Sequence, residues 1–444
     1  MNQFNRREFI QLTATAIGGI ILTGCGSGSS SSTAPNGYRF YRIKGNGETV
    51  DPTGTSFSVE HFYGSAHISD DGIITFDAKD AGKRRGLFQL GVDTHGSRPK
   101  IAWERSALMT GDTLADGRVV ATFKHHDVDQ RGNIAAVIDA DVRYHEDHYG
   151  SGLYLDHDQQ GFTPLLIAGD ELFAGEAVSS GILGDLSFIE GSLISHVHHL
   201  PAKDSPTTTK NSLLHLPNAS LTQARILSSS GELIAGTDHS IATFGLLDHN
   251  LSGDYSAGVA TAHSALEALP NATNSHLNIT GNIKYPGDLQ ITTAPFPADD
   301  GSNTVSGDGG YGSRVAVDAA VYSLLDVGEE MTLLRNNEPI LTTGDASLTG
   351  TIRAITTGSA GADGLYYYTA VTEIDGGIGM TLFVYDGLSH IPLLASGDSL
   401  SDGSAKVEQI LFGTTTKHVN SDNHLVLLCS LSDGTTSLVL GLPS

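Results

Sequence analysis

The chain has 444 residues, of which 50 are acidic and 25 are basic, giving a formal net charge of −25 at pH 7. A surface this acidic repels nucleic-acid phosphates, so nucleic acid is excluded as a partner. The charge favours cations or basic partners, or serves solubility alone. The chain has two cysteines, Cys25 and Cys429, and Cys25 is assigned below as the site of lipid attachment. No internal disulfide is therefore expected, and the stability of the fold must come from packing.

The first 24 residues resemble a bacterial twin-arginine export signal. Arg6 and Arg7 are followed by Glu-Phe-Ile, which matches the pattern of two arginines, any residue, Phe and an aliphatic residue. The apolar stretch at 12–22 is interrupted by Thr and Gly, so it falls short of the roughly 20 apolar residues that a membrane span needs. We therefore predict that residues 1–24 are a removable signal peptide.

The end of this segment resembles the lipobox of bacterial lipoproteins. Leu-Thr-Gly precedes Cys25, and the resemblance implies that the Cys25 sulfur carries diacylglycerol. Residues 25–37 are then the lipidated cysteine and a flexible Gly/Ser tether. Gly26 stands where an Asp would mark retention in an inner membrane. The resemblance implies a cell-envelope protein bound to a membrane through Cys25, on the outer membrane if the cell has one.

After the tether, the chain shows short β-rich segments bounded by Gly, Asp or Asn, and no helical period. Two strands are expected before Gly72, at 38–44 and 56–63. The first repeat unit then contains four strands, at 73–78, 86–90, 100–104 and 118–124. After Asn423 only two strands remain, at 424–431 and 435–442.

Two sequence markers repeat with one period along the chain. A Gly followed by Asp or Glu recurs in steps of 53 to 62 residues, at Gly111-Asp112, Gly169-Asp170, Gly231-Glu232, Gly287-Asp288, Gly344-Asp345 and Gly397-Asp398. A turn glycine that opens a β-rich run recurs in steps of 52 to 62 residues, at Gly72, Gly132, Gly191, Gly253, Gly312 and Gly364, with Asn423 in the seventh place. One four-stranded module is therefore repeated about seven times.

This repetition predicts an all-β fold, a seven-bladed β-propeller in which residues 38–444 form one domain. A four-stranded sheet cannot bury both of its faces alone, so the sheets must stack radially. The two strands before Gly72 and the two after Asn423 are expected to form the seventh blade together, which closes the ring and removes its exposed edges. The alternative is two smaller β domains divided at 299–312.

One segment resembles a family of exported bacterial tandem-repeat proteins named for an Asn-x-x-Gly-x-x-Ala-Phe motif. It runs from Asp129 through Gly132 to Ala136, and Leu153-Tyr154 and the run 165–170 follow. Asp129 and Ala136 replace the Asn and Phe of the motif. The resemblance implies a propeller-like fold and no particular activity.

Two groups of residues suggest chemistry. The run Gly397-Asp398-Ser399-Leu400 spells the nucleophile block of GDSL-type esterases, with Ser399 as nucleophile. The block has a sister at 111–117 that lacks the serine, which favours a structural turn in which Asp bonds nearby amides. Histidines also cluster, and His196 and His198 would project from one face of a strand as metal ligands. With His145 and His148 in an adjacent unit, they form a candidate zinc or copper site.

The sequence therefore predicts a cell-envelope lipoprotein whose propeller presents a binding or scaffold surface to a protein, glycan or cation. The competing hypothesis is an envelope enzyme. It would be metal-dependent through His145, His148, His196 and His198, or a hydrolase through Ser399. No cofactor is identified by a sequence motif.

Overall fold

The computed structural model describes residues 37–48, 58–141, 150–173, 176–189, 191–201, 210–232, 239–249, 255–264, 275–282, 290–293, 315–317, 320–327, 330–336, 338–356, 358–374, 376–412 and 417–444. These residues are almost all in β-strands and turns, with two single-turn 3-10 helices and no α-helix. No helix within these ranges has the length and apolar character needed to cross a membrane. The all-β prediction is confirmed.

The described strands form seven antiparallel sheets, numbered here in chain order. Sheet 1 contains β2 (Val59–Ile68), β3 (Ile73–Asp80), β4 (Arg85–Asp93) and β5 (Lys100–Met109). Sheet 2 contains β6 (Val119–Val128), β7 (Ile134–Asp141), β8 (Gly150–Asp156) and β9 (Phe162–Ile167). Sheet 3 contains β10 (Glu171–Phe173), β11 (Glu176–Ile189), β12 (Ser192–Pro201), β13 (Lys210–Leu216) and β14 (Arg225–Ser229), with η3 (Pro217–Ala219) and η4 (Leu221–Gln223) between the last two strands.

The remaining sheets follow the same plan. Sheet 4 contains β15 (His239–His249), β16 (Tyr255–Ser264), β17 (Ser275–Asn282) and β18 (Gln290–Thr293). Sheet 5 contains β19 (Val315–Val317), β20 (Ala320–Val327), β21 (Glu330–Arg335) and β22 (Glu338–Thr342). Sheet 6 contains β23 (Ala346–Ser347), β24 (Gly350–Ile355), β25 (Ser359–Ala360), β26 (Tyr366–Ile374), β27 (Gly377–Tyr385) and β28 (His390–Ala395). Sheet 7 contains β29 (Val407–Leu411), β30 (Leu425–Leu431), β31 (Thr436–Pro443) and, from the other end of the chain, β1 (Tyr38–Gly45).

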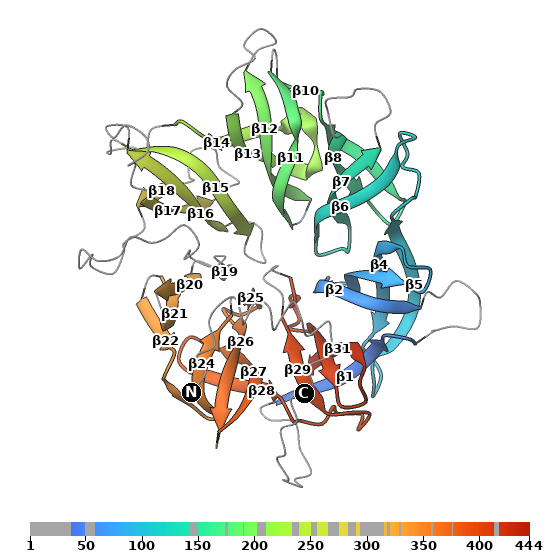
Figure 1. The fold of residues 1–444 in the computed structure, drawn as a ribbon, viewed down its shortest axis with the longest axis vertical. Helices are drawn as coiled ribbons and strands as arrows, with labels where there is room; N and C mark the ends of the chain where they lie inside the picture. Colours follow the sequence, from blue (N-terminus) through green and yellow to red (C-terminus); the bar gives the residue numbers. More distant parts are fainter. Residues whose placement is uncertain are drawn as a thin grey trace.

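The sheets lie side by side around a common centre, with β2, β6 and β11 toward that centre (Figure 1). This arrangement explains the composition of the middle strands, because a sheet covered on both faces needs apolar residues at successive positions. The first six residues of β3 are all buried, as are the first five of β30. By contrast, most residues of β5 at the outer edge of sheet 1 are half-buried or exposed, and only its last two residues are buried. The sheets are therefore packed face to face in a propeller-like arrangement.

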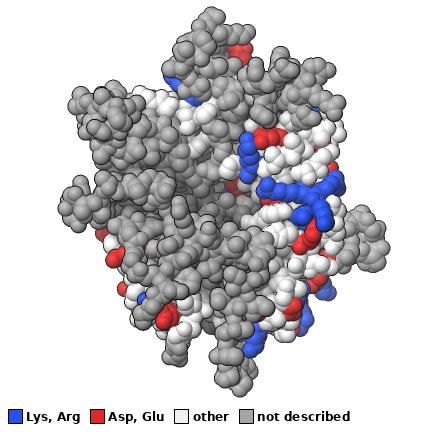
Figure 2. All heavy atoms as spheres, in the orientation of Figure 1, with Lys and Arg blue, Asp and Glu red and all other residues white. Residues whose placement is uncertain are grey.

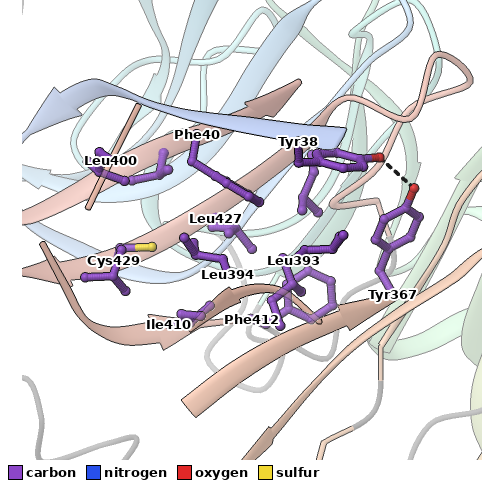
Figure 3. Packing of buried hydrophobic residues seen from close by; sticks show 14 of the residues in the cluster. Tyr38, Phe40, Tyr367, Leu393, Leu394, Leu400, Ile410, Phe412, Leu427 and Cys429 are labelled. Carbon is purple, nitrogen blue, oxygen red and sulfur yellow. Dashed lines mark hydrogen bonds between the residues drawn. The ribbon is translucent and has the colours of Figure 1, made fainter. Parts of the chain in front are cut away.

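Sheet 7 joins the two ends of the chain. Tyr38 pairs with Pro443, and the antiparallel register continues to Gly45 opposite Ser437. The Tyr38 hydroxyl lies 2.8 Å from the Tyr367 hydroxyl of sheet 6, and the core around them contains the buried Cys429 (Figure 3). Cys429 is therefore a buried residue that packs with the apolar side chains of this core.

The strand composition of this sheet corrects the prediction. We expected residues 56–63 to join residues 38–44 in it, but β2 is the first strand of sheet 1. The chain supplies β29 instead, a five-residue strand that the sequence analysis did not identify. Residues 118–124 likewise belong to β6 at the start of sheet 2, not to the end of the first unit. Sheets 1, 2 and 7 therefore begin one strand earlier than expected.

A glycine–acid pair turns the chain from one sheet into the next. Before sheet 7, the Gly397 N–H donates to the Val407 carbonyl at 2.7 Å, and the Asp398 carboxylate accepts the Ala395 N–H at 2.8 Å. Gly397 has φ +96°, a conformation that glycine adopts without strain. The same bonds recur around Asp112, Asp170 and Asp345. The repeated acid is thus a turn residue, while Gly287-Asp288 lies outside the described residues.

A second repeated turn joins the first and second strands of a sheet. The Asp129 carboxylate accepts the N–H groups of Arg131 at 3.0 Å and Asn133 at 2.9 Å. Asn420 caps the corresponding turn of sheet 7 in the same way. Neighbouring turns are also joined by a hydrogen bond, in which the Asp70 N–H of sheet 1 donates to the Gln130 carbonyl of sheet 2 at 2.9 Å. These turns fasten sheets 7, 1 and 2 together at one end of their inner strands.

Candidate functional site at the centre of the sheets

Polar side chains meet where the inner segments of four sheets end. His67 ends β2, His126 and Asp127 end β6, and Phe188 ends β11. Lys417 comes from the inner segment of sheet 7 and bonds the ends of β6 and β11, while the Ile68 N–H donates to its carbonyl at 2.9 Å. We call Lys417, Asp127, His67 and His126 the central cluster.

Lys417 is held by three acceptors. Its ammonium donates to Asp127 Oδ2 at 2.9 Å, to the Val128 carbonyl at 2.6 Å and to the Phe188 carbonyl. The residue is only 6% exposed. An ammonium group has three protons, so all of its donors are used, which is the condition under which a buried charge is tolerated. Lys417 therefore connects sheet 7 to sheets 2 and 3.

Asp127 is fixed from the other side. Its Oδ2 accepts the Phe188 N–H at 2.7 Å, and its Oδ1 accepts the Val128 N–H at 2.8 Å. At 2% exposure the carboxylate depends on these bonds and on Lys417 for its charge. The ion pair and its amide donors form one closed set of partners.

His67 and His126 lie against this ion pair with their rings 5.1 Å apart, edge to face. His67 Nδ1 is 3.6 Å from Asp127 Oδ1. Within the described part of the chain, His67 has no hydrogen-bond partner at either ring nitrogen, and neither has the buried His126 Nε2. Burial, and then the charges of His418 and Lys417, hold the pKa of His67 well below its usual value. Burial and then His67 lower the pKa of His126 to about 3.

The cluster thus combines a locked ion pair with two imidazoles that are neutral at physiological pH. Beside it is a cavity of about 10 Å³, the size of one water molecule. The cavity is lined by Ile68, Asp70, Asp129, Gln130, Lys417, Val419 and Asn420. Because Lys417 and Asp127 bond each other and backbone groups, their main contribution is to hold strand ends together.

The structure describes two of the four predicted metal ligands. His196 and His198 lie two residues apart on β12, His196 buried and His198 half-buried. Residues two apart on a regular strand project from the same face of the sheet. Burial, and then His199, lower the pKa of His198. His145 and His148 lie outside the described residues, and so do Cys25, Arg6 and Arg7. No group of three or more His, Cys, Asp or Glu in the described ranges is arranged to hold a metal.

The GDSL-like block forms the connector between sheets 6 and 7. Ser399 is exposed and bridges to Lys406 across this turn, and the Asp398 carboxylate is engaged by the turn itself. Ser401 fastens the turn to β1, since its N–H donates to the Phe40 carbonyl at 2.7 Å and its hydroxyl accepts the Phe40 N–H at 2.9 Å. These bonds are structural in kind.

A serine–histidine contact in sheet 3 was missed by the sequence analysis. Ser192 Oγ lies 2.8 Å from His215 Nε2, and Arg225 Nε donates to His215 Nδ1 at 3.0 Å. Because Nδ1 accepts, the proton of the neutral ring is on Nε2, so His215 donates to Ser192. Burial and then Arg225 lower the pKa of His215 to about 4. This tautomer is the wrong one for a base that activates Ser192.

Basic side chains gather over sheets 1 and 2 (Figure 2). Most of them are matched by acids nearby, as Arg85 is by Asp77 and Lys124 by Asp139 at 3.0 Å. Burial raises the pKa of Asp77 to about 6, against the opposing effect of Arg85. These ion pairs offset part of the positive charge on this surface.

Comparison with known proteins gives remote likenesses. No family model and no curated protein matches the chain. Among solved structures, a chain from a study of two prolyl endopeptidases is 8% identical at a TM-score of 0.47, over 87% of this chain and 50% of that one. An oligogalacturonate lyase in complex with manganese is 11% identical at a TM-score of 0.38, over 86% and 98% of the two chains. A Trypanosoma rangeli sialidase is 10% identical at a TM-score of 0.35, over 91% and 58%.

The chain spans about half the length of the prolyl endopeptidase chain that it matches. These likenesses are too remote to assign the fold, so the fold is assigned from the strand pairing of this chain itself.

Proposed function

We propose that this chain is an exported lipoprotein of the cell envelope, a closed seven-bladed β-propeller that serves as a binding or scaffold module. The observation that carries the proposal is the position of β1. It begins at Tyr38, one residue after the end of the predicted tether, and pairs along its length with β31. The first described strand thus follows directly after the Gly/Ser tether, as expected for a module that a flexible tether connects to Cys25.

The repeated motifs support a scaffold. Both of them form turns whose side chains bond backbone groups of their own or neighbouring sheets, as Asp398 and Asp129 do. The repeats therefore build a frame, and ligand specificity is assigned to loops and to the outward faces of the sheets. The ligand classes that fit an acidic envelope module are a protein, a glycan or a cation, and not nucleic acid.

Export and lipidation are tested in a bacterium with a twin-arginine system, using palmitate labelling and cell fractionation. We expect the wild-type chain to incorporate label and to fractionate with membranes. The Cys25→Ala variant should lose the label, and Arg6→Lys/Arg7→Lys should keep the precursor in the cytoplasm. Cys429→Ala is the matched control and should behave as wild type. Label retained by Cys25→Ala, or export of the double-lysine variant, would contradict the proposal.

The alternative, a metal-dependent envelope enzyme, draws on His196 and His198 sharing one face of β12. Elemental analysis of the natively exported protein separates the two functions. Stoichiometric zinc or copper that is lost in His196→Ala/His198→Ala favours the enzyme, whereas metal-free protein favours the scaffold. For the esterase version, a fluorophosphonate probe must label the wild-type chain and not Ser399→Ala.

A further inference from the structure

Two ionisable side chains of the central cluster, His67 and His126, are not part of its ion pair. Lys417 and Asp127 bond each other and nearby backbone groups, while His67 and His126 only pack against them. His67 is 1% exposed and has no hydrogen-bond partner at either nitrogen among the described residues. Two buried imidazoles beside a buried ammonium, with no hydrogen-bond partner at His67 or at His126 Nε2 among the described residues, are a costly arrangement once they take up protons.

The charges around the two rings come from four elements. His67 on β2 faces Lys417 and His418 of sheet 7, and also Asp127 of β6. His126 on β6 faces His67, Asp127 and His125, together with Arg85 of β4. The named neighbours thus include two fixed cations, Lys417 and Arg85, and one carboxylate, Asp127, which Lys417 already neutralises.

We propose that the central cluster is an acid-sensitive latch: protonation of His67 and His126 loosens the bond of Lys417 to sheets 2 and 3 while the outer strands stay paired. A proton on either ring places a second cation beside Lys417 in a buried site. The new cation competes for the single carboxylate of Asp127 and repels the ammonium. The three acceptors of Lys417 lie on β6 and β11, so weakening them separates inner strands of three sheets.

The pH window follows from the direction of the shifts. The pKa values of both histidines are lowered in the folded chain, so the unfolded chain binds protons first as the pH falls. The stabilising effect of neutral His67 and His126 is complete above about pH 6.5 and is lost as the pH drops below it. For each histidine, the unfolding equilibrium constant rises up to about tenfold per pH unit in this window.

The test measures urea unfolding of the whole mature domain at pH 7.5, 6.5, 5.5 and 4.5. His67→Gln/His126→Gln should show a slope shallower than wild type by up to about a hundredfold per pH unit in the unfolding constant. His157→Gln is the matched control, because the His157 side chain is 61% exposed, and its slope should equal that of wild type. Other buried histidines contribute equally to all three proteins. Equal slopes in the double variant and wild type would overturn the proposal.

A second measurement needs no variant. Hydrogen exchange of the wild-type chain, normalised to the intrinsic rate at each pH, compares 417–426 and 185–189 with the outer strands β1 and β5. We expect the inner peptides to lose protection at least tenfold more than the outer strands between pH 7.5 and 5. Uniform loss of protection, or none, would overturn the latch.

Discussion

Replacing Lys417 by methionine tests whether the centre of the domain depends on one ion pair. The substitution keeps most of the side-chain volume and removes the charge. Asp127, 2% exposed, would then keep two amide donors but lose the Lys417 ammonium, and the Val128 and Phe188 carbonyls would lose their shared donor. Breaking a buried pair in this way costs about 3–5 kcal/mol of unfolding free energy.

Urea unfolding followed by circular dichroism measures this loss, with Lys406→Met as the matched control. Lys406 is exposed on a connector, so its substitution should change the unfolding free energy by less than about 0.5 kcal/mol. The double variant Lys417→Met/Asp127→Asn should recover part of the loss, because no unpaired charge is left. A loss below about 1 kcal/mol in Lys417→Met would refute the view that this pair holds the strand ends.

Three further predictions address the frame. Gly169 has φ +97°, and an added Cβ would have no atom within 4 Å. Gly169→Ala should therefore lower the unfolding free energy by about 1–2 kcal/mol through backbone strain alone. Urea unfolding measures this loss, and an unchanged midpoint would contradict it. Deleting residues 38–45 should expose the edge of β31 and cause aggregation detectable by light scattering; a monomeric, stable product would show that β1 is dispensable. Cys429 is buried, and its burial raises the pKa of the thiol, so iodoacetamide should label it only in denaturant. Rapid labelling of the native domain at pH 8 would contradict its placement in the core.

The repeat turns are the part of the fold that local sequence can predict. The carboxylates of Asp398 and Asp129 accept backbone N–H groups only three and four residues away, so each copy carries its own local signal. The phase of the repeat was missed because the units were counted from the turn glycines such as Gly132, which join the first and second strands of a sheet, and not from the Gly–acid pairs, which lie between sheets. β29 is five residues long with mixed burial, which leaves little pattern to detect.

The central cluster was predictable only in fragments. The sequence shows His126 and Asp127 as neighbours, but the cation that completes the pair, Lys417, lies 290 residues from Asp127. Local periodicity carries no information about such a pairing, because the packing of distant sheets brings the two segments together. The same holds for Ser192 and His215, whose contact depends on the register of β12 against β13.

The pairing of β1 with β31 has a consequence for synthesis. The partner of Tyr38 is Pro443, so β1 cannot pair until synthesis has passed residue 443. Contacts this distant in sequence form slowly, because the intervening chain must be ordered first. A chain that stops before β31 would leave β1 without its partner, so the last step of folding depends on the C-terminal strand.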